Sequence, residues 1–150
     1  TAFNVRNNEI GGVLGQSQIK RLDSNIKKRN FNNEYFLKNL NSDIYFVDFE
    51  LKGQSNYAFN IILKEPDKIL FKKLCEILDK NSIEFRIGSA GGGNQLRQPY
   101  VKEINLFTDQ EIIQNFPNAD HVHFFGMYIG NYPDLDDSEI IWLTNTISNV

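Results

Sequence analysis

Cysteine is almost absent from this chain of 150 residues, since Cys75 is the only one. A lone thiol excludes an intrachain disulfide and any paired-cysteine zinc or redox motif, and it suits a reducing compartment. Long apolar runs are missing too, because no stretch approaches the roughly 20 consecutive apolar residues that a membrane-spanning helix needs. The sequence therefore predicts a cytoplasmic protein without a membrane segment.

An excess of positive charge is also lacking, since 16 lysine and arginine residues stand against 19 aspartate and glutamate residues. The formal net charge is −3 and the sequence pI is about 5.4, which argues against a nucleic-acid-binding protein, because such proteins usually carry a basic surface. Hydrophobic residues make up 41% of the chain and charged residues 23%, a composition typical of globular proteins. The length fits one domain of ordinary size. Since Thr1 leads directly into a patterned segment, we expect this domain to be part of a longer protein.

The first part of the chain has a helical pattern. Apolar residues recur about every four positions, which predicts one long helix from Asn7 to Leu40. Gly11, Gly12 and Gly15 lie inside it, and each glycine costs up to about 1 kcal/mol relative to alanine. Close approach of another backbone would compensate for them. Alternatively, they mark a loop that precedes a shorter helix.

After residue 42 the pattern alternates between strands and helices. Aromatic and β-branched residues predict two strands within residues 43–65, around a turn at 53–56. The further predicted elements are a helix from Pro66 to Asn81, a strand Ile83–Ile87, a helix Gln110–Phe116, a strand Met127–Gly130 and a helix Ser138–Ile147. This order predicts an α/β or α+β layered domain with a small sheet packed against helices.

A glycine run is the first candidate functional segment. Gly91, Gly92 and Gly93 are not followed by the Gly-Lys-Ser/Thr of a phosphate-binding loop, and they lack the GxGxxG spacing of dinucleotide-binding folds. The next polar residues are Asn94, Arg97 and Gln98. Their amide and guanidinium donors suit phosphate or sugar hydroxyl groups, although exposed loops also carry such residues for solubility.

Two histidines are the second candidate. His121 and His123 flank Val122, so on a strand they would share one face and resemble a metal-binding pair. No third ligand follows from the spacing, and we predict no metal site. A hydrogen bond from an imidazole to a substrate remains open, as does a structural or surface role. The chain also lacks a Gly-x-Ser-x-Gly elbow, an HExxH helix and a convincing carboxylate pair, so a self-contained hydrolase is not predicted.

Four segments, in order along the chain, resemble the DegT/DnrJ/StrS family of sugar aminotransferases and related sugar dehydratases. They are residues 3–10 with the continuation at 18–23 and 28–29, residues 92–100 (GGNQLRQPY), residues 116–120 (FPNAD) and residues 126–135. The resemblance implies the fold-type-I aminotransferase architecture, the cofactor pyridoxal 5′-phosphate and a homodimer with active sites at the subunit boundary. It also implies that residues 1–42 are the helical connector from a large domain and residues 43–150 the small C-terminal domain.

The resemblance also implies roles for individual residues. Asn4 would reach the cofactor phosphate of the neighbouring subunit, and Arg6 would lie near the same site. The substrate-binding residues would be Asn94, Arg97, Gln98, His121, Tyr128 and Asn131. The family's cofactor-binding lysine belongs to a segment that is absent from this chain. We therefore predict no catalytic residue here and no activity of this chain alone.

For the intact protein, the leading hypothesis is an aminotransferase that converts a nucleotide-linked keto sugar to an amino sugar for lipopolysaccharide, including O-antigen, or another surface polysaccharide. The first alternative is a 3-dehydratase of the same family, in which histidine replaces the cofactor-binding lysine and a hydroxyl group is removed instead. The second alternative is a non-catalytic module that binds a nucleotide sugar or a protein partner. The identity of the residue at the lysine position would separate the first two.

Overall fold

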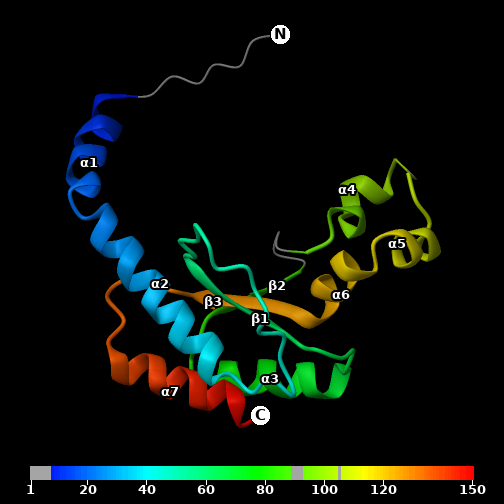
Figure 1. Ribbon diagram of the computed structural model, residues 1–150. Helices are drawn as coiled ribbons and strands as arrows, with labels where there is room; N and C mark the ends of the chain where they lie inside the picture. The colour runs from blue at the N-terminus through cyan, green and yellow to red at the C-terminus, as the bar shows by residue number, and fades with distance from the viewer. Residues whose placement is uncertain (1–7, 89–92, 105) are drawn as a thin grey trace.

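A three-stranded antiparallel sheet lies at the centre of the computed structural model, which describes residues 8–88, 93–104 and 106–150 (Figure 1). Its strands are β1 (Ala58–Ile62), β2 (Phe85–Ile87) and β3 (Gly126–Gly130), in the order β1-β3-β2. Phe59 of β1 and Phe85 of β2 both lie opposite Ile129 of β3, so these three side chains share one face. The predicted small sheet with helices is confirmed.

Three helices pack on that face: α2 (Leu22–Asn39), α3 (Lys68–Lys80) and α7 (Asp137–Ser148). Figure 1 shows α3 and α7 running beneath the sheet, with α2 crossing beside it. The core joins side chains from all of these elements, among them Phe36, Phe59, Leu74, Ile129 and Ile147. Phe36 and Phe59 are in ring contact, with centroids 4.6 Å apart, so the second half of α2 belongs to the same core as the sheet.

The helices that follow β2 form an arm that extends from the end of the sheet where β3 begins (Figure 1). They are the short η2 (Gln95–Arg97), α4 (Pro99–Lys102), α5 (Asp109–Asn115) and α6 (Pro117–Phe125). The chain passes from α6 directly into β3, where the Gly126 backbone N–H caps the helix by donating to the Val122 carbonyl. This arm therefore has a fixed connection to the central strand.

The predicted long helix is wrong in one respect, because it is two helices. α1 (Glu9–Ile19) ends at a turn formed by Lys20 and Arg21, and α2 begins at Leu22. α1 has no buried residue, and a Cβ added at Gly12 or Gly15 would meet nothing within 4 Å. The close backbone that was expected to compensate for the glycines is thus not supplied by the described part of this chain. The predicted boundary after residue 42 stays a prediction.

The first of the two strands predicted within residues 43–65 is also wrong. Tyr45 makes only an isolated bridge to Leu63, and the chain then turns away from the sheet. The apolar side chains in between still pack against the core from an irregular segment: Val47, Phe49 and Leu51. The alternation of apolar and polar residues therefore predicted which side chains are buried, but it did not predict whether the segment pairs with the sheet. The predicted turn contains Gly53 at φ +77°, a conformation that favours glycine.

The remaining predicted elements are confirmed with bounds that differ by at most two residues: α3, β2, α5, β3 and α7. Capping boxes define the N-terminal ends of α5 and α7. Thr108 accepts from the Glu111 backbone N–H while Glu111 reaches back to the Thr108 backbone, and Asp136 and Glu139 repeat this capping box at α7. η2, α4 and α6 were not predicted; η2 has 3 residues and α4 has 4, which is too short to show an apolar period.

Replacing Tyr45 with phenylalanine should lower the free energy of unfolding by about 1 kcal/mol. The Tyr45 hydroxyl is fully buried and donates to the Ile147 carbonyl at 2.8 Å, so the substitution leaves a buried carbonyl without its partner. Denaturant unfolding measures this change. The exposed Tyr57→Phe is the matched control, with an expected change near zero, and an equal effect of both substitutions would contradict the prediction.

Candidate functional site

The second face of the sheet carries a row of polar side chains. Asn60 and Arg86 both lie opposite Tyr128 of the central strand, so the three side chains stand side by side across β1, β3 and β2. Next to this row Ala58 pairs with Gly130, and the two small residues leave a hollow of about 370 Å³. We call this hollow the open-face pocket.

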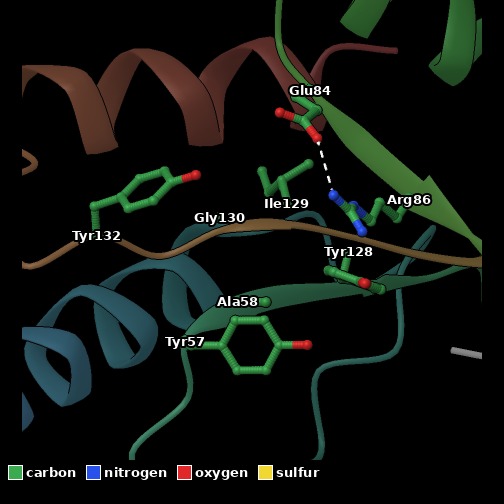
Figure 2. A pocket seen from close by; sticks show the side chains of 8 residues that line it. All are labelled: Tyr57, Ala58, Glu84, Arg86, Tyr128, Ile129, Gly130 and Tyr132. Atoms are coloured by element: carbon green, nitrogen blue, oxygen red, sulfur yellow. Dashed lines mark hydrogen bonds and ion pairs between the residues drawn. The ribbon is translucent and has the colours of Figure 1, made fainter. Parts of the chain in front are cut away.

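Aromatic rings form much of the wall of the open-face pocket (Figure 2). Tyr57 meets Tyr128 edge to face, with ring centroids 6.2 Å apart. Tyr132 folds back over the sheet, and a Cβ at Gly130 would overlap its ring. Glycine at position 130 is thus needed to let the Tyr132 ring lie where it does. The pocket combines phenol groups with one guanidinium and one carboxylate, those of Arg86 and Glu84.

A second, smaller hollow of about 50 Å³ continues from Arg86 and Tyr128 towards Gly88 and Val122 of α6. There Gly88 and Gly93 pack closely against His123. A Cβ at Gly88 would overlap the His123 carbonyl oxygen, and a Cβ at Gly93 would overlap its Nδ1. Gly88 and Gly93 are therefore required by close packing within the chain. Gly91 and Gly92 lie outside the described residues.

An ion pair fixes the segment that follows the glycine run. Arg97 binds Asp120 of α6 with two hydrogen bonds: Nε donates to Oδ1 at 2.6 Å and Nη2 donates to Oδ2 at 2.9 Å. Arg97 Nη1 also donates to Asp109 at 2.8 Å, and the guanidinium lies over the Phe124 ring. The Arg97 side chain is only 9% exposed, and the Asp120 hydrogen bond raises its already high pKa. This arginine is thus a permanent cation held by its own chain.

Unpaired polar atoms remain close to this ion pair in sequence. Asn94 Nδ2, Gln98 Nε2 and His123 Nδ1 are buried and make no hydrogen bond within the described residues. Burial lowers the pKa of His123; Asp120 opposes the shift, while Arg97 and Lys102 add to it. At neutral pH the imidazole is therefore uncharged. Buried amide donors without partners are costly, and oxygen atoms of a ligand would satisfy them.

The predicted site residues occupy four places. Asn94, Arg97 and Gln98 lie together on the segment that Arg97 ties to α6, and Tyr128 lies in the open-face pocket. His121 and His123 are on the α6 helix, so the shared face considered for a strand is wrong; His121 Nε2 donates to the Leu63 carbonyl at 2.6 Å. Asn131 is buried at the end of β3 against α2. Asn4 and Arg6 lie outside the described residues.

Asn131 and Asn94 show two different uses of a buried carboxamide. Asn131 Nδ2 donates to the carbonyls of Arg29 and Asn56, and its Oδ1 accepts from Asn32, so its polar atoms are engaged within the chain. Asn94 Oδ1 caps η2 by accepting from Leu96, but its Nδ2 has no partner. Substrate binding by both stays a prediction. Asn94 has a donor available for it.

Pyridoxal phosphate does not find a complete site among the described residues. A pyridine nitrogen needs an acid, and the one buried carboxylate of residues 8–88, 93–104 and 106–150 is Asp120, which Arg97 already binds. No group of three or more metal-ligating side chains occurs in the described part of the chain either. The free amide donors of Asn94 and Gln98 suit hydrogen bonds to ligand oxygen atoms, such as those of sugar hydroxyls or phosphate.

Sequence reasoning missed several residues of this surface. Arg86 alternates with Phe85 and Ile87 in the short β2, and that alternation places it on the face opposite the core. Asp120 belongs to the segment FPNAD, but nothing in its spacing indicates that it lies beside Arg97, 23 positions away. Contacts of this range depend on the packing of α6 against the segment after β2.

Replacing Gly88 with alanine should lower the free energy of unfolding by roughly 1–3 kcal/mol, because the added methyl group overlaps the His123 backbone. The matched control is Gly15→Ala on α1, where a Cβ has open space and helix propensity improves. We expect Gly15→Ala to be neutral or stabilising by up to about 1 kcal/mol. Chemical denaturation measures both, and equal changes would contradict the packing of Gly88 on His123.

No helix of the described residues combines the length and the apolar character needed to cross a membrane.

In comparisons with known proteins, residues 1–148 match the DegT/DnrJ/EryC1/StrS aminotransferase family. Over 131 residues, 87% of this chain, the sequence is 30% identical to a GDP-4-keto-6-deoxy-D-mannose 3-dehydratase of Escherichia coli O55:H7. Over 141 residues, 93% of the chain, it is 33% identical to a protein of the same name from Yersinia pseudotuberculosis.

The fold agrees with these sequence matches. A crystal structure of GDP-4-keto-6-deoxymannose-3-dehydratase with a trapped PLP-glutamate geminal diamine superimposes with a TM-score of 0.74 at 27% identity, over 98% of this chain and 37% of that chain. The predicted aminotransferase architecture is thereby confirmed. The chain spans about a third of the length of the curated relatives it matches, 32% and 34%.

Proposed function

The chain belongs to the DegT/DnrJ/EryC1/StrS aminotransferase family, whose members are pyridoxal-phosphate-dependent enzymes of nucleotide-linked sugars, and we propose that the protein carrying it is a 3-dehydratase. The observation behind this proposal is that two relatives matched over about nine-tenths of the chain both bear the name GDP-4-keto-6-deoxy-D-mannose 3-dehydratase. The proposed substrate is therefore a GDP-linked 4-keto-6-deoxy sugar. This replaces amino transfer, the leading hypothesis from the sequence, with its first alternative.

The chain's own contribution in this proposal is to bind and orient the sugar. Arg97 and Asp120 hold the segment from Gly93 to Gln98 rigidly on α6. The free amide donors of Asn94 and Gln98 then donate hydrogen bonds to oxygen atoms of the substrate. The His123 imidazole is neutral, because burial lowers its pKa. Orientation by fixed donors is worth several orders of magnitude in rate when it places the reacting atoms correctly.

The cofactor proposed for the intact protein is pyridoxal phosphate, which supplies an electron sink for removing a substituent from the sugar. Asn4 is the proposed contact to the cofactor phosphate of the neighbouring subunit in a homodimer, and Arg6 is proposed to lie near the same site. We further propose that the deoxygenated product enters surface polysaccharide, including the O-antigen of lipopolysaccharide. Light scattering on the intact protein tests the dimer, and a monomer with full activity would exclude a shared site.

The reaction is tested by incubating the intact protein with pyridoxal phosphate, glutamate and GDP-4-keto-6-deoxy-D-mannose, and by following the sugar by mass spectrometry. A 3-dehydratase yields a sugar that has lost its 3-hydroxyl oxygen. An aminotransferase instead yields a sugar with nitrogen in place of the keto oxygen. Formation of the amino sugar would overturn the proposal, and so would tight GDP-sugar binding without turnover, which a non-catalytic module predicts.

A further inference from the structure

The arginines of the described residues differ sharply in how much of their binding capacity is free. Arg97 has three N–H groups committed to Asp120 and Asp109 and is nearly buried. Arg86 is 57% exposed, and its one contact with a protein charge is to Glu84 at 3.5 Å. That carboxylate is 80% exposed, and exposed ion pairs of this kind contribute little. Arg86 thus keeps a nearly complete set of donors for an external anion.

Arg86 also has the right surroundings for a ligand. Arg86 lines the open-face pocket. The volume of this pocket, about 370 Å³, falls within the range of small-molecule sites. Of the other arginines, Arg21 is exposed and Arg29 is half-buried, and neither lines the hollows around this sheet. Figure 2 shows Arg86 beside Tyr128, with Tyr57 and Tyr132 projecting from the neighbouring segments. Phenol groups next to a guanidinium suit a sugar or base attached to a phosphate.

We propose that the open-face pocket binds the diphosphate portion of the nucleotide sugar through Arg86, with Tyr57 and Tyr128 against the adjoining sugar or base. The proposal rests on the proposed function for the class of ligand. It moves phosphate recognition away from Arg97, which acts through Asp120 to position the segment with Asn94 and Gln98. On entry of the ligand the guanidinium exchanges its weak contact with Glu84 for phosphate oxygens.

A substitution of Glu84 should change phosphate affinity in the direction opposite to a substitution of Arg86. Its carboxylate repels a phosphate bound at Arg86, so removing its charge should strengthen binding. Loss of the arginine should weaken it. Two neighbouring substitutions with opposite effects on affinity are not expected from a general loss of structure, because both side chains are exposed.

Isothermal titration calorimetry on the intact protein, with GDP and guanosine as probes, tests the pocket. Arg86→Ala should weaken GDP binding by about tenfold to a hundredfold and Arg86→Lys by less, while guanosine binding stays unchanged. Glu84→Gln should bind GDP more tightly than the unchanged protein. Arg21→Ala, on an exposed corner between α1 and α2, is the matched control and should bind GDP normally.

The outcomes separate this inference from the proposed function. Normal GDP affinity in Arg86→Ala, together with intact dehydratase activity, would overturn the pocket assignment and leave the 3-dehydratase standing. Equal losses for GDP and guanosine would also overturn it, because the arginine would then not act on phosphate. If the unchanged protein binds neither GDP nor another nucleoside diphosphate, both proposals fall together.

Discussion

Replacing Arg97 with alanine should lower the free energy of unfolding by roughly 3–5 kcal/mol, the largest loss expected from any single substitution outside the apolar core. The substitution leaves the Asp120 carboxylate, only 12% exposed, without the guanidinium that now makes two hydrogen bonds to it. A buried carboxylate without a partner is far less stable than in water. Chemical denaturation of the intact protein and of the variant measures the difference.

Two further variants show whether the buried charge causes this loss. Asp109→Asn removes the outer partner of Arg97, which is 69% exposed, and should cost less than about 1 kcal/mol. Arg97→Met combined with Asp120→Leu removes both charges and should recover much of the stability lost by Arg97→Ala. An Arg97→Ala effect no larger than that of Asp109→Asn would contradict the assignment of Arg97 as an anchor.

The same ion pair explains why only part of the site could be predicted from the sequence. The donor residues Asn94, Arg97 and Gln98 could be recognised from their types and from the family resemblance. Their division of labour could not, because it depends on Asp120, which reaches Arg97 only once α6 has packed against η2. A guanidinium that binds phosphate and one that binds a buried carboxylate are identical in sequence. Hydrogen bonding and burial in the folded chain distinguish them.

For the fold, the sequence was reliable where local signals were strong. α3 and α7 lie where the apolar periodicity predicted them, and Asp67 and Asp136 cap their first turns. The errors fall where tertiary packing decides. Residues 43–51 alternate like a strand, yet only Tyr45 pairs, because the chain uses the other apolar side chains to cover the core without joining the sheet. Single-sequence periodicity does not separate these two outcomes.

Among the residues that the structure describes, none buries the apolar side chains of α1. Ile10, Val13 and Leu14 are all more than half exposed, and every glycine whose surroundings are described on this helix faces open space. The apolar periodicity of residues 9–19 therefore predicted a helix correctly, but the described residues do not bury it. Burial of α1 requires surface beyond the described residues, which agrees with a chain that spans about a third of its relatives' length.

Replacing Asn131 with alanine should lower the free energy of unfolding by roughly 2–3 kcal/mol, with little effect on the KM of the intact enzyme. The Asn131 carboxamide joins α2 to β3: Nδ2 donates to the Arg29 carbonyl at 3.0 Å and to the Asn56 carbonyl at 2.9 Å, and Oδ1 accepts from Asn32 at 3.2 Å. Two part-buried carbonyls lose a donor, while Asn32 Nδ2 keeps its hydrogen bond to the Tyr132 carbonyl. Each buried polar group left without a partner costs about 1–3 kcal/mol.

Asn94→Ala is the matched comparison, because it removes the same side chain from a place where one amide donor is free. Its cost in stability should be smaller, about that of one helix cap, and its effect should appear mainly in the KM for the nucleotide sugar. Substrate contact by Asn131, which the family resemblance implies, predicts the reverse for that residue. A raised KM in Asn131→Ala, with an unchanged unfolding midpoint, would therefore favour the resemblance over the hydrogen bonds that hold this side chain between helix and sheet.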